Sequence, residues 1–231
     1  MKFWMSLICC FFAGFVSIHG ADSVFAGSVS GYMVPSTFSA NNANYTIMGA
    51  YSYLGIDQHA LDLEYDRIAN TESGDDIQSS MIAIYTYYDA SRFRPRIGVH
   101  RINTAGPNNN GIIGILGASY DYLDKNYYKK WTAGTDVYYS SYDFTASTFS
   151  ALQLSPHFTT YFYPKIFPGY MAVSAKYHAI FPSDSRGYSQ DYFTSFQLGV
   201  SYSYYPVTVT LKGWEGESIY GVYKGGILVY N

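Results

Sequence analysis

The sequence predicts an all-β fold, an up-and-down antiparallel β-barrel of twelve transmembrane strands. Apolar and polar residues alternate with a period of two over most of the chain, and turn-forming residues separate the alternating segments. Only 13% of the residues are charged, against roughly 25% in an ordinary soluble domain. A barrel of about ten or about fourteen strands also fits, because segment boundaries read from sequence carry errors of about two to four residues.

The first twenty residues have the form of a secretory signal peptide. Lys2 precedes an apolar and small-residue run from Phe3 to Ile18, after which the chain becomes polar. A retained N-terminal anchor is the alternative. We therefore expect a signal peptide at 1–20 and a barrel domain at 21–231. Both cysteines, Cys9 and Cys10, lie in the signal peptide, so the barrel domain has no thiol for a disulfide, a metal site or a nucleophile.

The charge of the barrel domain is mildly acidic. Removing residues 1–20 takes away Lys2 and no acid, which leaves 14 − 1 = 13 basic residues against 17 acidic ones, a formal charge of −4. This balance argues against a general polyanion binder, and we expect no nucleic-acid partner.

The alternating segments and the links between them give the expected topology. Short links fall near 55–57, 89–91, 124–125, 164–166 and 205–206, and the other links are mostly longer and more polar. Short turns at one end and long loops at the other are typical of an up-and-down transmembrane barrel. The strands are expected at 24–34, 44–55, 58–69, 77–88, 92–103, 111–123, 126–140, 146–163, 167–181, 191–204, 206–214 and 219–230.

Alternation alone does not say whether the apolar face meets lipid or a protein core, because a soluble barrel alternates with its apolar face inward. The placement of the aromatic residues favours lipid. Many lie near the short links, as Tyr51 and Tyr85 do, and a looser group that includes Tyr138, Tyr139 and Phe149 lies near the long links. Aliphatic residues fill the space between the two groups, which is the pattern of a membrane-facing wall.

On this architecture the chain resembles bacterial outer-membrane β-barrel proteins, over essentially all of 21–231. The final residues, "YKGGILVYN", supply Lys224, Gly226 and Val229 of the last-strand assembly signal of such proteins, but the terminal aromatic, Tyr230, is displaced by one position. The size is similar to that of small monomeric porins for acidic oligosaccharides, although no motif assigns the chain to that subfamily. The resemblance implies location in the outer membrane after cleavage, with the membrane lipid and the outer-membrane assembly machinery as partners.

Two charged rows are predicted to line the same sector of the lumen. If Leu61, Leu63 and Tyr65 face lipid, the acidic residues between and after them face inward. Because side chains alternate between the two faces of a strand, the basic residues at alternating positions of the strand expected at 92–103 also face inward. Charges that line a pore set its selectivity, although the two rows could instead neutralise each other and plug the barrel. The expected selectivity residues are Asp62, Glu64, Asp66, Arg92, Arg94, Arg96 and His100.

A second inward patch is expected from His157, Lys176 and His178. Histidine can act as a base or a metal ligand, but two histidines without a third fixed ligand are a weak metal signal. No motif for nucleotides, zinc or calcium occurs, and no serine is matched with a base and an orienting group. We therefore expect no metal, no cofactor and no enzymatic activity.

The expected function is a narrow channel for the diffusion of small polar or charged solutes. A closed barrel with a structural or surface-interaction role is the second possibility, with loops near Asn41–Asn44 and Asn108–Asn110 as its contact surface. A soluble, secreted ligand-binding barrel is the third.

Overall fold

The structure is a computed structural model. It describes residues 9–19, 24–38, 43–71, 76–104, 110–144, 147–166, 168–184, 191–204, 207–216, 221–223 and 227–229. The regular secondary structure of these residues is entirely β-strand. Within the described ranges no helix is long and apolar enough to cross a membrane.

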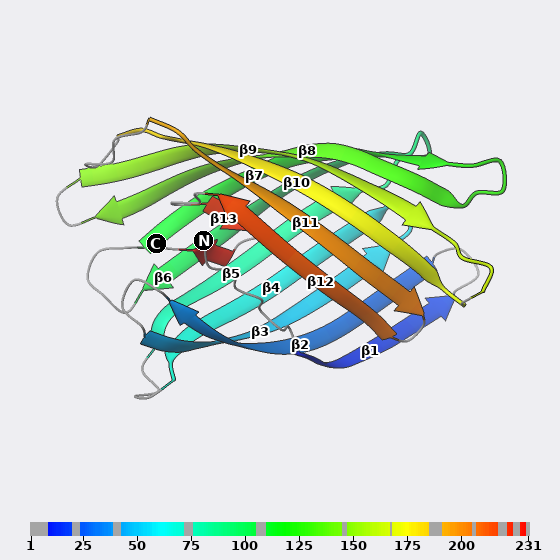
Figure 1. Ribbon diagram of the computed structural model, residues 1–231, viewed down its shortest axis with the longest axis horizontal. Helices are drawn as coiled ribbons and strands as arrows, with labels where there is room; N and C mark the ends of the chain where they lie inside the picture. The colour runs from blue at the N-terminus through cyan, green and yellow to red at the C-terminus, as the bar shows by residue number, and fades with distance from the viewer. Residues whose placement is uncertain are drawn as a thin grey trace.

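Twelve strands form one antiparallel sheet in which each strand pairs with the next along the chain (Figure 1). This confirms the all-β, up-and-down arrangement. The sheet is not closed, because β1 and β12 lie at its two ends. The strands are β1 (Cys9–His19), β2 (Val24–Phe38), β3 (Ala43–Ile56), β4 (His59–Asn70), β5 (Asp76–Tyr87), β6 (Phe93–Thr104), β7 (Asn110–Leu123), β8 (Lys129–Phe144), β9 (Ser147–Phe162), β10 (Tyr170–Pro182), β11 (Phe193–Tyr204) and β12 (Val207–Gly216).

The eleven strands predicted between residues 24 and 214 correspond in order to β2–β12, whereas the described parts of the predicted strand 219–230 do not join that sheet. In its place β13 (Gly221–Tyr223) and β14 (Ile227–Val229) pair with each other in a separate two-stranded sheet. Tyr223 pairs with Ile227 across three residues that include two glycines, and short glycine-containing links favour hairpins. Lys224, Gly226 and Tyr230 of the expected assembly signal lie outside the described residues.

The twelfth strand of the main sheet is β1, from the segment predicted to be a signal peptide. It pairs with β2 from Cys9↔Met33 to His19↔Val24. An apolar segment without proline can add to a free strand edge through its backbone alone, whatever its role in the cell. Cleavage after residue 20 stays a prediction.

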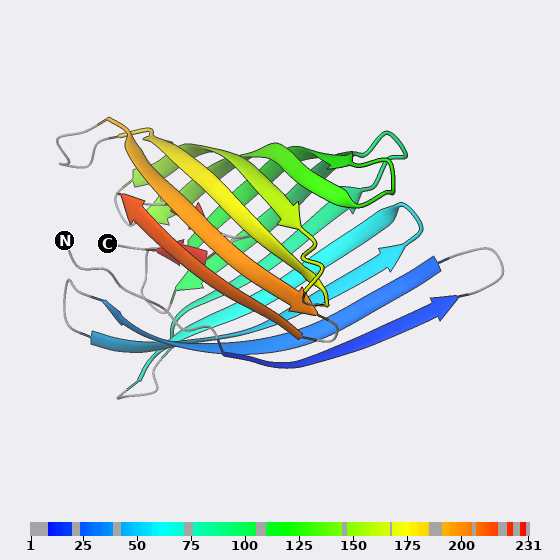
Figure 2. The ribbon, with the colours of Figure 1, turned by 45° about the vertical axis from the view of Figure 1, so that its right-hand side comes forward.

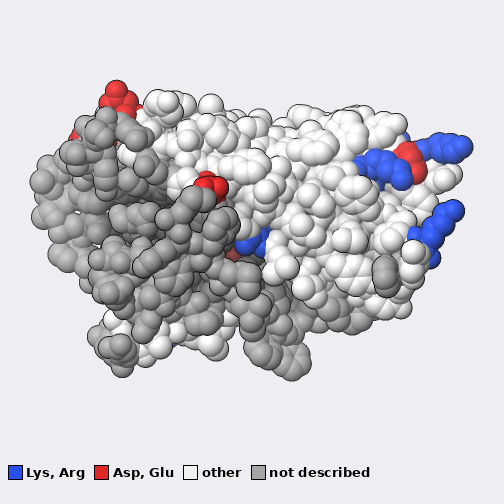
Figure 3. Space-filling view, viewed as in Figure 1, with Lys and Arg blue, Asp and Glu red and all other residues white. Residues whose placement is uncertain are grey.

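The sheet curls, so that it has a concave inner face and a convex outer face (Figure 2). On β11, Leu198 and Val200 lie on the outer face, 52% and 44% exposed, whereas Ser195 and Gly199 on the other face are buried. Large exposed apolar side chains cover the outer face of many other strands, including Ile97 on β6. Apart from one small basic and acidic spot near the centre, most of the described surface seen in Figure 3 is uncharged up to the basic residues at its right-hand end.

The inner face is less polar than predicted. Part of it is an apolar cluster to which the consecutive strands β5 to β11 each contribute. Tyr138 and Phe149, which the aromatic pattern assigns to the lipid face, belong to this cluster. Its members are Ile82, Ile102, Ile113, Ile115, Tyr138, Tyr142, Phe149, Ala151, Ile180 and Phe193.

Candidate functional site on the inner face

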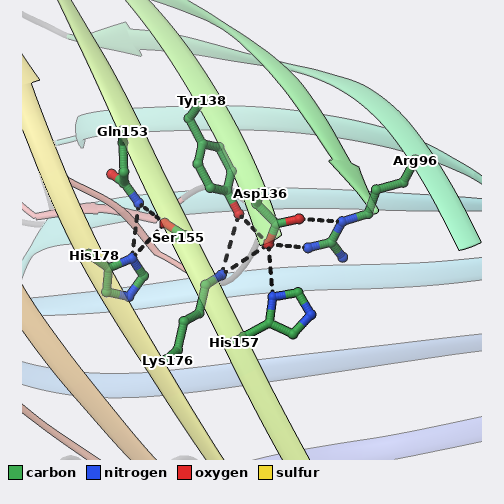
Figure 4. A network of polar contacts seen from close by, with 8 residues as sticks. All are labelled: Arg96, Asp136, Tyr138, Gln153, Ser155, His157, Lys176 and His178. Atoms are coloured by element: carbon green, nitrogen blue, oxygen red, sulfur yellow. Dashed lines mark hydrogen bonds and ion pairs between the residues drawn. The ribbon is translucent and has the colours of Figure 1, made fainter. Parts of the chain in front are cut away.

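Asp136 on β8 is the centre of a buried ionic network (Figure 4). Its carboxylate is 0% exposed and forms an ion pair with Arg96 of β6, whose Nε donates to Oδ1 at 2.7 Å. Lys176 Nζ from β10 lies 3.4 Å from Oδ2, and His157 Nδ1 from β9 lies 3.7 Å from the same oxygen. Tyr138 Oη also donates to Oδ2, at 3.4 Å. One carboxylate therefore joins side chains from four strands.

Glycine makes room for this network. Arg96, Gly117 and Asp136 lie in one row across β6, β7 and β8, so the Arg96 side chain reaches Asp136 by crossing over Gly117. A Cβ atom at Gly117 would come within 2.9 Å of Arg96 Nε. Gly134 does the same for His157, because a Cβ atom there would lie 2.7 Å from His157 Nε2. A glycine in a strand often marks such a close approach.

Asp121 on β7 organises a second ionic group. It is 1% exposed and forms ion pairs with Arg94 and with Lys129, the latter at 2.9 Å. Thr132 Oγ1 donates to Asp121 Oδ1 at 2.6 Å. We call the four cations around the two buried carboxylates the basic cluster, which consists of Arg94, Arg96, Lys129 and Lys176 with Asp121 and Asp136.

The basic cluster carries two more positive than negative charges, four cations against two carboxylates. The carboxylates are 0–1% exposed, whereas the four cationic side chains are 17–32% exposed. The acids thus lie beneath the cations. An anion that reaches the inner face would meet the positive groups first.

The predicted acidic row lies on β4, and Asp62 and Asp66 are held by hydrogen bonds. Tyr51 Oη donates to Asp62, so Tyr51 lies on the inner face and not in a lipid-facing band. Ser80 Oγ donates to Asp66 at 3.3 Å. The third member of the row, Glu64, lies between them on the same strand and is half-buried.

The ion pairs of Arg94 and Arg96 go to β7 and β8, and not to β4 as one alternative supposed. Arg94 and Arg96 face inward as predicted, but their ion-pair partners are Asp121 and Asp136 on the other side of β6. Arg96 also lies close enough to Asp62 for an electrostatic interaction. Arg92 does not belong to the row. It lies in the β5–β6 turn with a φ of 72°, and its amide donates to Asp89 O at 2.9 Å.

His100 faces inward on β6 but does not contact open space. Its side chain is completely buried, and its strand partners are Ile82 and Ile113. Neither ring nitrogen has a hydrogen-bond partner in the structure. We therefore assign His100 to the apolar part of the inner face, away from the basic cluster.

The predicted patch of His157, Lys176 and His178 divides into two environments. The first two residues contact Asp136, whereas His178 contacts Ser155 and Gln153. Ser155 Oγ lies 2.9 Å from His178 Nδ1, a spacing that a nucleophile and its base can show. The third group is the neutral amide of Gln153, and all three side chains are at most 2% exposed. This arrangement supports a structural role for the trio.

Within the ranges that the structure describes, no group of three or more His, Cys, Asp or Glu side chains is placed to hold a metal ion. The comparisons with known proteins give no name to the arrangement. No protein-family model, no curated protein and no solved structure matches the chain.

Proposed function

We propose that this protein is a bacterial outer-membrane β-barrel whose charged interior forms a narrow path for small charged solutes. The observation that carries the proposal is the contrast between the two faces. The outer face is apolar and exposed, while ionised side chains gather on the inner face, where the cationic ones are partly exposed. A soluble ligand-binding barrel has the opposite distribution.

The outer surface supports insertion into lipid. Leu116 and Ile97 are 62% and 60% exposed on neighbouring strands. Exposed apolar patches larger than a few hundred Å² are rare on soluble monomers and mark sites of interaction with proteins or membranes. Here such side chains recur from β3 to β12, which fits a surrounding bilayer better than one partner. Outer-membrane lipid and the assembly machinery of that membrane are the proposed partners.

The directions of the edge strands determine how the barrel can close. Without β1, the free edges belong to β2 and β12, which run in the same direction because ten antiparallel steps separate them. Two parallel edges cannot complete an antiparallel barrel. One more strand, antiparallel to both, is needed, and a barrel in a membrane leaves no edge unpaired. We propose that 219–230, with its alternating sequence, takes this position once residues 1–20 are removed.

The arrangement of charge supports passage of small ions or charged solutes. The basic cluster extends across β6–β10, and the acidic row lies on β4 with β5 between them. A solute between the two groups would experience a field directed across the path, and such lining charges decide which ions pass. The excess of positive charge in the cluster favours anions.

Conductance of the purified chain in a planar lipid bilayer tests this function. We expect discrete current steps with a preference for anions. In the variant Lys129→Gln/Lys176→Gln, Asp121 and Asp136 each keep an arginine partner, so the fold should persist while anion preference falls. Arg101→Gln, which removes an exposed charge from the outer face of β6, is the control. Unchanged selectivity in the double variant would remove the basic cluster from the path.

A closed barrel is the second candidate, and the apolar cluster is the observation that favours it. Ile102, Ile113 and Ile180 are completely buried on the inner face, so no aqueous path crosses them. Folded, membrane-inserted protein that shows no conductance would support this function, and the loops would then be the place to search for partners.

A further inference from the structure

Two neighbouring turns at the short-turn end carry an unbalanced group of lysines. Lys125 lies in the β7–β8 turn, Lys130 lies at the start of β8, and Lys165 lies in the β9–β10 connection. Lys125 and Lys165 are exposed, and Lys130 is 44% exposed. We call these three lysines the basic rim. Figure 3 shows basic residues with an acidic residue between them at this end of the molecule.

Asp124 is the acid within this group, and its role in the turn is fixed. Its Oδ1 accepts hydrogen bonds from the amides of Asn126 at 2.8 Å and Tyr128 at 3.0 Å, and its Oδ2 lies 3.3 Å from Lys130 Nζ. Slight burial would raise the pKa of Asp124, but these hydrogen bonds and the lysine hold it below its usual value. Asp124 therefore cancels one lysine, and the rim keeps an excess of two positive charges.

Tyrosines join the two turns into one surface. The rings of Tyr128 and Tyr163 are 5.0 Å apart, and Lys130 Nζ lies 5.8 Å from the centroid of Tyr163. Tyr127 and Ile166 extend from the turns with 78% and 85% of their surface exposed. Rings and aliphatic groups beside lysines suit the boundary between lipid and water, where the apolar part is buried and the charge stays among headgroups.

We propose that the basic rim binds the phosphate groups of anionic phospholipids in the membrane leaflet at the short-turn end. The proposal rests on the membrane-spanning barrel proposed above. Charge complementarity identifies the occupant, since lysine is a point-charge ligand for phosphate. The excess of positive charge is confined to the β7–β8 and β9–β10 turns among the turns that the structure describes at this end. The turns on the other side of the sheet, β3–β4 and β5–β6, carry Asp57, Asp89 and Arg92, a net negative charge.

The test compares unfolding by urea in vesicles of phosphatidylcholine with unfolding in vesicles that also contain phosphatidylglycerol. At low salt each lysine near an anionic surface contributes about 1 kcal/mol, which is about a fivefold change in the folding equilibrium. Phosphatidylglycerol should therefore stabilise the wild type on the order of 25-fold, because Asp124 offsets one of the three lysines. The variant Lys125→Gln/Lys130→Gln/Lys165→Gln should lose this gain while keeping its stability in phosphatidylcholine.

Single substitutions give a matched control. Lys165→Gln should lose about fivefold of the gain, whereas Arg101→Gln, the same change of charge on an exposed residue of β6, should lose none. Equal stability in the two lipids, or equal losses in these two variants, would overturn the proposal. A chain that does not insert into phosphatidylcholine at all would overturn the membrane barrel itself and this inference with it.

Discussion

Replacement of Asp136 with alanine is expected to lower the free energy of unfolding by about 3 kcal/mol. Removing one partner from a buried ionic network costs about 3–5 kcal/mol, because the remaining charges lose their counterion. Here Arg96 and Lys176 would lose Asp136, but their side chains are 32% and 17% exposed. Water therefore screens part of the loss, and the lower end of the range applies. Urea unfolding in detergent micelles or lipid vesicles measures the change.

Asp143→Ala is the matched control, because Asp143 lies on the same strand as Asp136 but is exposed. An exposed substitution of this kind changes stability by less than about 0.5 kcal/mol. Similar losses in the two variants would show that the network around Asp136 does not stabilise the fold more than an ordinary surface acid does.

Deletion of residues 217–231 from a chain that begins at residue 21 is expected to abolish folding. The remaining strands, β2–β12, have two edges that run in the same direction and cannot close an all-antiparallel barrel, and unpaired backbone groups within a bilayer cost several kcal/mol each. Deletion of residues 1–20 alone is expected to leave folding intact, because 219–230 would supply the closing strand. Circular dichroism in vesicles and resistance to unfolding by dodecyl sulfate at room temperature report the folded fraction.

The opposite pattern would contradict this account. If the chain without residues 1–20 fails to fold while a chain of residues 1–216, which keeps β1 and lacks 217–231, folds, β1 is a permanent strand of the protein. The pairing of β1 with β2 would then describe the mature fold, and the signal-peptide prediction would be wrong.

Most of the sheet could be predicted from the sequence because its strands are regular. The segment 111–123, for example, corresponds to β7 at Asn110–Leu123, since an alternating run bounded by turn residues has one plausible pairing pattern. The C-terminal segment was harder. Its alternation is compatible both with a long strand and with the hairpin of β13 and β14, and local sequence does not choose between partners that lie far away.

The site was predictable only in part. The alternation along β6 correctly predicts that Arg94 and Arg96 face inward. Which acidic residues they contact depends on the register of β6, β7 and β8. Gly117 decides this for Arg96, by allowing its side chain to cross β7. A usable signal existed in β7, where Asp121 is the sole charged residue of the strand and lies on its inner face. The apolar cluster escaped prediction because inner and outer faces both contain aliphatic residues.

The most direct test of the central claim is the reactivity of single cysteines along β11 toward a charged, water-soluble maleimide. A chain that begins at residue 21 has no native cysteine. In protein inserted into vesicles, the maleimide therefore reports only on the one cysteine that each variant introduces. The inner-face variants Gln197→Cys and Ser201→Cys should react from a water-filled lumen. The outer-face variants Leu198→Cys and Val200→Cys should be protected by lipid. Reaction at positions 198 and 200, with protection at 197 and 201, would contradict the account, because the apolar outer face would then meet water and not lipid.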